Sequence, residues 1–146
     1  MSTTISPSAA RGARDLRSTF GRLRRRLRDV ADLETLTPSQ TSVLSRLAKD
    51  GDTSASDLAA AERVRPQSMA ATLAVLDERG LLERRPDPDD GRRQILSLSR
   101  AGREFVDDSR RTREEWLARA LQDHLSESER RTLLDAIALL ERISDL

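Results

Sequence analysis

Four of the five arginines between Gly80 and Gly102 lie on the arms and the turn of a segment that is typical of a β-hairpin. Apolar residues lead into and out of a polar turn, which is the pattern of two short strands joined by a tight connection. The arms and the turn carry Arg84, Arg85, Arg92 and Arg93. A guanidinium group presents a planar fork of donors to phosphate or guanine. A slender cationic hairpin of this kind indicates insertion into a groove of a nucleic acid.

A second candidate surface precedes the hairpin. Pro66 opens a predicted helix that continues to Arg79, and Gly80 stops it. Its inward stripe consists of Met69, Leu73 and Leu76. Small or hydrogen-bonding side chains occupy its other faces, namely Gln67, Ser68, Ala70, Ala71 and Ala74. A helix surface without long charged side chains can lie deep in a major groove.

These two surfaces need a scaffold, and the preceding segments predict one. A capping box at Thr37 and Gln40 opens a helix with Val43, Leu44 and Leu47 inward. A shorter helix is predicted from Ser54 to Glu62, followed by a turn at Val64 and Arg65. Two short helices followed by a two-stranded hairpin predict a winged helix-turn-helix. The expected fold class is mainly α with a small β-hairpin (α+β); a small α+β domain that binds no nucleic acid is the alternative.

Long amphipathic helices are predicted on both sides of this core. The first has an apolar stripe of Leu16, Phe20, Leu23, Leu27 and Val30. A long helix over Arg100 to His124 and a last helix, opened by a capping box at Ser126 and Glu129, follow the hairpin. A small monomer offers too little surface to cover the apolar faces of long helices at both ends of the chain, so we expect a homodimer. The expected domains are dimerisation helices at 1–34 and 101–146 around a DNA-binding domain at 35–100.

Charge is unevenly placed along the chain. The net charge is only +1, and Lys49 is the one lysine among 26 basic residues. The polar face of the first helix carries Arg14, Arg17, Arg22, Arg24, Arg25, Arg26 and Arg28. Either this face is simply solvated or it contacts backbone phosphates. Genomic bias towards arginine is as good an explanation for the composition as selection for binding.

Composition excludes several classes of protein and site. The chain has no cysteine, so it has neither disulfides nor thiolate metal sites. His124 is the only histidine, which excludes a His-rich metal site, and its place near a helix end suits an interaction with the helix dipole. Without tyrosine or a glycine-rich phosphate loop, the chain is poorly equipped as an enzyme, and we expect no cofactor or metal. No apolar run approaches the roughly 20 residues that span a bilayer, and the polar start lacks a signal-peptide core, so we expect a cytoplasmic protein without a membrane partner.

Several of these residues together resemble the MarR (multiple antibiotic resistance regulator) family. The resemblance rests on Leu58, Ala59, the run from Pro66 to Leu76, Gly80, Leu81, Arg84, the tip Asp90, Gly91 and Arg92, and then Leu98, Ser99 and Gly102. It covers Thr37 to Gly102 by motif and the rest by helix order. Ser99 stands where threonine is usual, and either can cap a helix. The resemblance implies a dimeric winged-helix transcription regulator, often released from DNA by small aromatic acids or other effectors.

The resemblance also implies roles for individual residues of the hairpin, or wing. Arg92 matches the wing-tip arginine that enters the minor groove, where a narrow groove concentrates negative potential. Asp90 matches the acidic residue that fixes the wing, although a turn former that binds its own backbone would fit equally well. Arg84 is placed for phosphate positioning, and so is Arg65, which precedes the predicted helix from Pro66 to Arg79, the recognition helix of the family. A solvated charge is the alternative for both arginines.

On the recognition helix, the match gives Gln67, Ser68, Ala70 and Ala71 as the residues that face the groove. Gln67 can pair bidentately with adenine, Ser68 can bind a base or phosphate, and alanine can touch a thymine methyl. Family members often carry a longer polar or basic side chain near Ala71.

The expected function is a homodimeric, sequence-specific regulator that binds double-stranded DNA. We expect a repressor of a near-palindromic operator, relieved by a small aromatic or anionic effector. Phe20, Arg113 and Trp116 are the candidate effector residues, with core or dimer-interface packing as the alternative for Trp116. An effector-independent architectural or protein-interaction module is the alternative function.

Overall fold

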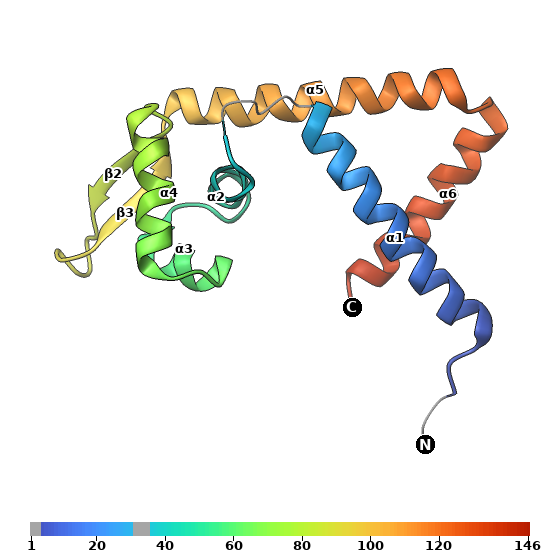
Figure 1. Ribbon diagram of the computed structural model, residues 1–146, viewed down its shortest axis with the longest axis horizontal. Helices are drawn as coiled ribbons and strands as arrows, with labels where there is room; N and C mark the ends of the chain where they lie inside the picture. The colour runs from blue at the N-terminus through green and yellow to red at the C-terminus, as the bar shows by residue number, and fades with distance from the viewer. Residues whose placement is uncertain (1–3, 31–35) are drawn as a thin grey trace. The chain divides into compact units, whose positions relative to one another are not determined.

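Local sequence signals set where the helices begin and end in the computed structural model, which describes residues 4–30 and 36–146 (Figure 1). The elements in chain order are α1 (Pro7–Val30), α2 (Pro38–Asp50), β1 (Thr53–Ser54), α3 (Ala55–Glu62), α4 (Pro66–Glu78), β2 (Leu82–Pro86), β3 (Gln94–Leu98), α5 (Arg100–His124) and α6 (Glu127–Ser144). A mainly helical chain with one small sheet confirms the expected winged-helix fold class.

Hydroxyl side chains cap α2 and α3, and they also cap α5 and α6. Thr37 caps α2 in a capping box, since its Oγ1 accepts from the Gln40 amide at 3.3 Å and Gln40 Oε1 accepts from the Thr37 amide at 2.9 Å. Ser54 caps α3 by accepting from the Asp57 amide at 3.2 Å. Helix α3 therefore begins at Ala55, one residue later than expected, because Ser54 holds an extended conformation outside the helix.

Two left-handed residues end the helices of the helix-turn-helix. Gly80 has φ 68° and follows α4, and the amide bonds from Gly80 to the Asp77 carbonyl and from Leu81 to the Leu76 carbonyl form a Schellman motif. Helix α4 thus ends at Glu78 rather than at the predicted Arg79. Arg63, with φ 55°, ends α3 in the same way, a conformation that glycine adopts more readily.

The sheet has three strands rather than the two that the sequence indicated. Its order is β1-β3-β2, and both pairs are antiparallel. Strand β2 pairs with β3 from Leu82 opposite Leu98 to Pro86 opposite Gln94. Strand β1 adds only Thr53 and Ser54, opposite Leu96 and Ile95. Two residues are too few to show the alternation by which a strand is recognised in a sequence.

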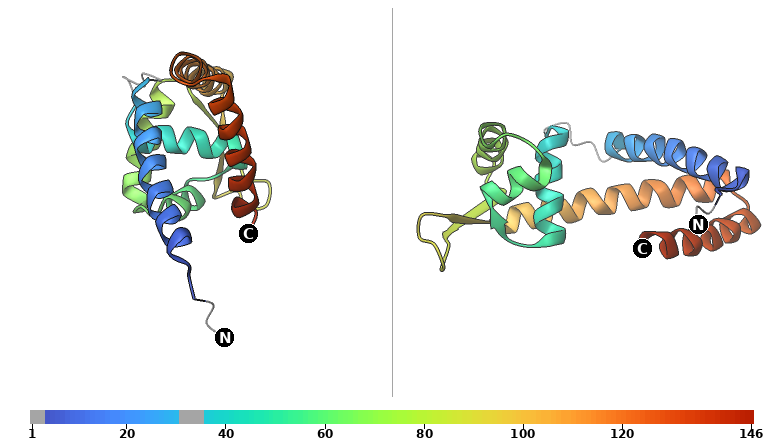
Figure 2. Two further views of the ribbon diagram at one scale, coloured as in Figure 1. Left: turned by 90° about the vertical axis from the view of Figure 1, so that its right-hand side faces the viewer. Right: turned by 90° about the horizontal axis from the view of Figure 1, so that it is seen from below.

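The buried apolar residues lie in one of two compact units, which comprises the described residues 36–111. Its core consists of Leu36, Val43, Leu44, Leu47, Leu58, Ala59, Met69, Leu73, Leu76, Leu81, Leu82, Leu96 and Leu98. The predicted inward residues of α2 and α4 are all among them. Around this core α2, α3 and α4 pack against the sheet, and the β2–β3 hairpin extends beyond the helices (Figures 1 and 2).

Hydrogen bonds of Ser99 and a close contact of Gly102 hold the start of α5 against the end of α4. Ser99 Oγ donates to the Gly80 carbonyl at 2.5 Å and accepts from the Gly102 amide at 3.0 Å, so it caps α5 while holding the chain after α4. Gly102 lies against the Leu81 carbonyl, where a Cβ would overlap the oxygen. This position has room only for glycine.

The second unit, called the helical unit below, comprises α1, the part of α5 from Thr112 on, and α6. None of its described residues is buried. Helices α1 and α6 overlap in Figure 1 but stand apart in the left view of Figure 2. The contacts divide the chain within α5, between Arg111 and Thr112, whereas the expected boundary lies at residue 100, where α5 starts. The other expected boundary, at residues 34 and 35, lies outside the described residues.

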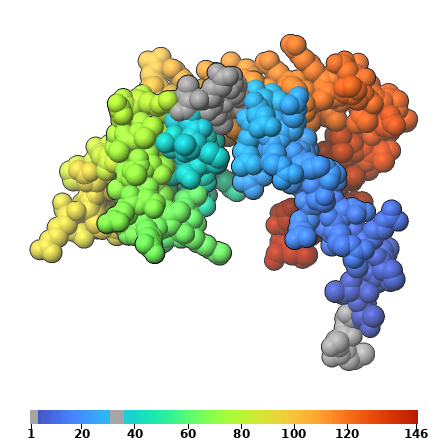
Figure 3. All heavy atoms as spheres, viewed as in Figure 1, coloured from blue at the N-terminus to red at the C-terminus, as the bar shows by residue number. Residues whose placement is uncertain are grey.

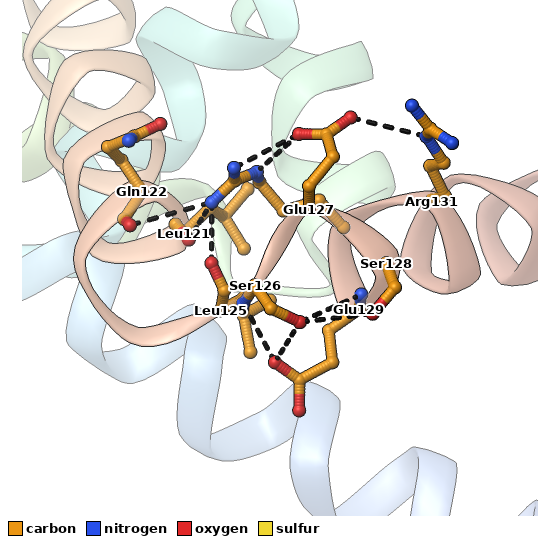
Figure 4. Close-up of polar contacts among 9 residues, drawn as sticks. Leu121, Gln122, Leu125, Ser126, Glu127, Ser128, Glu129 and Arg131 are labelled. Atoms are coloured by element: carbon orange, nitrogen blue, oxygen red, sulfur yellow. Dashed lines mark hydrogen bonds and ion pairs between the residues drawn. The ribbon is translucent and has the colours of Figure 1, made fainter.

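A polar corner joins α5 to α6 (Figure 4). Ser126 and Glu129 form the expected capping box of α6. Arg130 Nη1 donates to the Leu125 carbonyl at 2.5 Å and to the Leu121 carbonyl at 3.4 Å, which satisfies oxygens at the end of α5. The same side chain pairs with Glu127 at 3.0 Å. These polar contacts hold the change of direction between the two helices.

Within residues 4–30 and 36–146, no helix combines the length and the apolar character that crossing a membrane requires.

Candidate nucleic-acid interface

Helix α4 separates its core face from an open face. Met69, Leu73 and Leu76 are buried, with exposed fractions of 2%, 1% and 0%. Arg65, just before the helix, is exposed. The predicted groove-facing residues are also all exposed, namely Gln67, Ser68, Ala70 and Ala71. The helix is thus anchored along one side and presents short side chains on the other. Such a surface permits close approach of a base-pair edge.

The amino end of α4 differs from that of the other helices of this unit. Its N-cap residue, Arg65, makes no side-chain capping bond, whereas Thr37 and Ser54 cap α2 and α3. Pro66 at the first helical position has no N–H group to satisfy. Uncapped amides carry the positive end of the helix dipole, and this end attracts anions. The exposed start of α4 is therefore electrostatically suited to a phosphate.

The tip of the wing is shaped by its own acidic residues. Asp90 Oδ1 accepts from the Arg92 amide at 3.0 Å, and the Asp90 carbonyl accepts from the Arg93 amide at 2.9 Å. The Asp87 amide donates to the Arg93 carbonyl at 2.9 Å and closes the neck of the turn. Through these bonds the Asp90 side chain holds the backbone from which Arg92 projects. The wing protrudes from the helices in the space-filling view (Figure 3).

Three of the four wing arginines form ion pairs with acidic residues. Arg84 Nη2 lies 2.6 Å from Asp77 on α4, Arg85 Nη1 lies 2.8 Å from Asp52, and Arg93 Nη2 lies 2.8 Å from Asp57 on α3. The Arg92 side chain, by contrast, makes no ion pair with any residue that the structure describes. The sequence predicted one cationic cluster. The wing instead has a neutralised base and one unpaired guanidinium at its tip.

Arg84 is affected most by this arrangement. Its Nε and Nη2 atoms donate to the Asp77 carboxylate at 3.1 and 2.6 Å, and its Nη1 lies 3.4 Å from Gln94 Oε1. Only an exposed edge of the group remains for phosphate. Arg84 therefore joins the wing to α4.

The acidic partners of the wing arginines were missed in the sequence, including the partner of Arg93. Asp52, Asp57 and Asp77 lie 33, 36 and 7 residues from their arginines, so no short-range spacing connects them. One local signal was available: Ser54 followed by Asp57 has the spacing of a capping motif, which places both at the start of a helix.

The pKa of Asp57 lies below its ordinary value. The hydrogen bond from Ser54 is the main cause; burial opposes it, and the charge of Arg93 adds to it. For Glu62 at the end of α3, burial raises the pKa, but hydrogen bonds from Arg46 and Ser42 on α2 outweigh burial and lower it. Both carboxylates therefore hold their neighbours as anions at neutral pH.

Comparison with known proteins agrees with this geometry. The model of the MarR family matches residues 34–93. An HTH-type transcriptional regulator of Mycobacterium tuberculosis is 41% identical over 138 residues, which cover 94% of this chain and 96% of that protein. The chain belongs to the MarR family. It is therefore a DNA-binding transcription regulator and not an enzyme.

Solved structures of MarR-like proteins are similar over almost the whole chain. A transcriptional regulator of Pseudomonas aeruginosa has a TM-score of 0.84 at 40% identity, covering 97% of this chain and 99% of that one. A MepR variant from S. aureus, solved with an oligodeoxyribonucleotide, has a TM-score of 0.67 at 21% identity, covering 91% and 96%. The latter similarity concerns the fold alone.

The candidate effector residues of this MarR-family chain all lie in the helical unit. Phe20 on α1 is 60% exposed. On α5, the Arg113 Nε atom is buried and has no hydrogen-bond partner among the described residues, and burial lowers the pKa of this side chain. Trp116 is half-buried, and the Arg26 guanidinium lies 5.5 Å from its ring centroid. A cation–π contact thus already occupies one face of the ring.

Proposed function

We propose that this MarR-family chain acts as a homodimer that represses transcription from a near-palindromic operator and is released by a small aromatic or anionic effector. The observation that carries the dimer is the bare apolar surface of the helical unit. Leu134, Leu139 and Ile143 on α6 are 65%, 57% and 62% exposed. Leu139 and Ile143 are four residues apart and so share one side of α6, and exposed apolar surface of this kind marks interaction sites. The expected dimerisation segments are residues 1–34 and 101–146.

A two-fold dimer presents two copies of α4. Recognition helices of such dimers enter successive major grooves about 34 Å apart, so the operator should have matching half-sites. Gln67 and Ser68 are the candidate base-reading residues, with Ala70 and Ala71 against thymine methyl groups. Arg65 and the uncapped start of α4 would hold the backbone, and Arg92, shaped by Asp90, would enter the minor groove. The DNA-bound MepR structure supports this use of the shared fold.

Footprinting upstream of the chain's own gene, followed by affinity measurements on that site and on random duplex, tests the proposal. Arg92→Ala should weaken binding to both duplexes, because a minor-groove arginine gains from electrostatic potential more than from base identity. Gln67→Ala should cost about 1–3 kcal/mol on the operator and relax the preference at one base pair. Arg100→Ala, which removes an exposed arginine paired with Glu104, is the matched control and should have little effect.

Three results would contradict the proposal. The first is unchanged operator affinity of Arg92→Ala at physiological salt. The second is equal affinity for operator and random duplex, which favours an architectural protein. The third is a monomer at micromolar concentration in sedimentation.

The effector part rests on Arg113, because a carboxylate would supply the buried Nε atom with an acceptor. Benzoate is a suitable probe, since it combines a carboxylate with an aromatic ring. It should lower operator affinity of the wild type, and Arg113→Lys should reduce this response, because lysine lacks the fork. Benzoate that leaves operator affinity unchanged would contradict an aromatic acid effector.

A further inference from the structure

Neighbouring arginines of the wing have opposite surroundings, and this contrast singles out Arg93. Arg92 has no ion pair with a described residue, whereas Arg93 contacts three polar side chains from two parts of the fold. Its Nη2 atom donates to Ser54 Oγ at 2.6 Å and to Asp57 Oδ2 at 2.8 Å. Its Nε atom lies 4.0 Å from Asp87 Oδ2 at the neck of the wing. Arg93 thus bridges the wing and the amino end of α3.

The strand register explains why this bridge forms. Ser54 on β1 lies opposite Ile95 on β3, so Arg93, two residues before Ile95, is its diagonal neighbour across the sheet. Ser54 is 3% exposed, and its hydroxyl also caps α3 through the Asp57 amide. The same hydroxyl donates to Asp57 Oδ2 at 2.8 Å. The Arg93 fork therefore meets a pair of side chains whose positions the helix cap already fixes.

The bridge also reaches the backbone that carries the tip. The Arg93 carbonyl accepts from the Asp87 amide, and the Arg93 amide donates to the Asp90 carbonyl, both at 2.9 Å. Arg92 lies between these bonds, with its own amide on the Asp90 carboxylate. Any movement of the Arg93 side chain away from α3 loosens the wing next to Arg92. The nearest other attachments of the wing, Arg84 to Asp77 and Arg85 to Asp52, lie on the opposite strand.

We propose that Arg93 is a positioning residue for DNA binding: held by Asp57 and Ser54, it fixes the wing to α3 and sets where Arg92 meets the minor groove. The proposal rests on the proposed role of Arg92 and deepens it. It assigns Arg93 no DNA contact, although the residue is an arginine beside the wing tip. Asp57, an acidic residue, becomes a contributor to DNA affinity.

Removing the Asp57 charge should change DNA affinity in opposite directions for the two possible roles of Arg93. If Arg93 were a phosphate ligand restrained by Asp57, then removing the acid would release a cation and tighten DNA binding. If Arg93 positions the wing, Asp57→Asn weakens binding even though the protein becomes more positive. Exposed ion pairs contribute about 0.2–1 kcal/mol, so we expect each of Asp57→Asn and Arg93→Ala to weaken operator binding about two- to fivefold. The double variant should bind no more weakly than the weaker single variant, because both substitutions break one contact.

A measurement on the free protein makes the test independent of DNA. Hydrogen exchange in the full chain should become faster at the Asp87, Arg92 and Arg93 amides in both single variants. Exchange within α4 should stay unchanged. Arg100→Ala, which breaks the Arg100–Glu104 pair on α5, is the control and should alter neither measurement. If Arg93→Ala fails to fold, Arg93→Lys replaces it in the single and double variants, because lysine keeps the charge but lacks the guanidinium fork.

The outcomes separate the two proposals. Faster wing exchange with weaker operator binding of Asp57→Asn supports the positioning role. Unchanged wing exchange, or operator binding of Asp57→Asn at least as tight as that of the wild type, overturns it. If the wild type does not prefer its operator to random duplex, the proposed function fails, and the exchange result alone then decides whether Arg93 holds the wing.

Discussion

The two units of this protein, the winged-helix unit (described residues 36–111) and the helical unit, are stabilised in different ways. In the winged-helix unit, apolar side chains from helices and strands are almost fully buried, and ion pairs such as Arg46–Glu62 and Arg93–Asp57 connect different elements. In the helical unit no described residue is buried, and its ion pairs, such as Arg11–Asp15 and Arg131–Glu127, join residues of one helix. The first unit has an interior of its own, whereas the second presents amphipathic helices.

This contrast has a consequence for function. A unit with a packed interior can hold α4 and the wing in a fixed geometry, which reading a groove requires. A unit of helices with bare apolar faces gains stability mainly from what covers those faces. A second copy would therefore stabilise the helices and set the separation of the two recognition helices by the same contacts. An effector that binds the helices and favours another separation would shift DNA affinity.

The largest expected effect compares a buried leucine with an exposed one. Leu58→Ala, at a position with 0% exposure, should lower the free energy of unfolding by about 2–5 kcal/mol and leave self-association intact. Leu134→Ala, at 65% exposure, should weaken the proposed dimer while barely changing the unfolding of dilute protein. Urea unfolding at low concentration and sedimentation equilibrium measure the two quantities. A similar loss for both variants in dilute protein would contradict the contrast between the units.

Glycines provide the next comparison. Gly102→Ala should lower the free energy of unfolding by about 1–3 kcal/mol, because the new methyl group overlaps the Leu81 carbonyl and α5 must shift. Gly21→Ala on α1 meets no atom within 4 Å, so it should raise stability by about 0.5–1 kcal/mol through helix propensity. Thermal unfolding of both variants measures these changes. A destabilised Gly21→Ala dimer would place a second subunit against that side of α1.

How well the sequence predicted a feature depends on how far apart its residues lie along the chain. Helix caps at Thr37 and Ser126 and the inward stripes of α2 and α4 were predicted correctly, because they depend on residues three or four positions apart. Strand β1 and the partners of Arg85 and Arg93 were missed, because they depend on the register of segments more than 30 residues apart. The candidate DNA contacts could be proposed since short exposed side chains on α4 follow from helical periodicity. That Arg92, alone among the four wing arginines, lacks an ion pair with any described residue follows only from the three-dimensional arrangement.

The smallest expected effect concerns two glutamates, one in each unit. Glu62 accepts from Ser42 Oγ and Arg46 Nε, both at 2.7 Å, whereas Glu129 accepts from the Ser126 amide within one helix cap. Both pKa values lie below the ordinary value. A carboxylate with a lowered pKa in the folded state adds stability at neutral pH, and this stability is lost as the pH falls from about 4.3, the pKa of an unfolded glutamate, through the lower folded value.

Glu62→Gln should therefore be less stable than the wild type at pH 7, and the difference should shrink on acidification through that range. Glu129→Gln should change little at any pH, because glutamine also completes a capping box. Urea unfolding of the three proteins between neutral and acidic pH tests both expectations. A pH-independent deficit of Glu62→Gln would mean that the link between α2 and α3 depends on side-chain shape rather than on charge. An equal deficit in both variants would remove the difference between a carboxylate that links two helices and one that acts within a single helix cap.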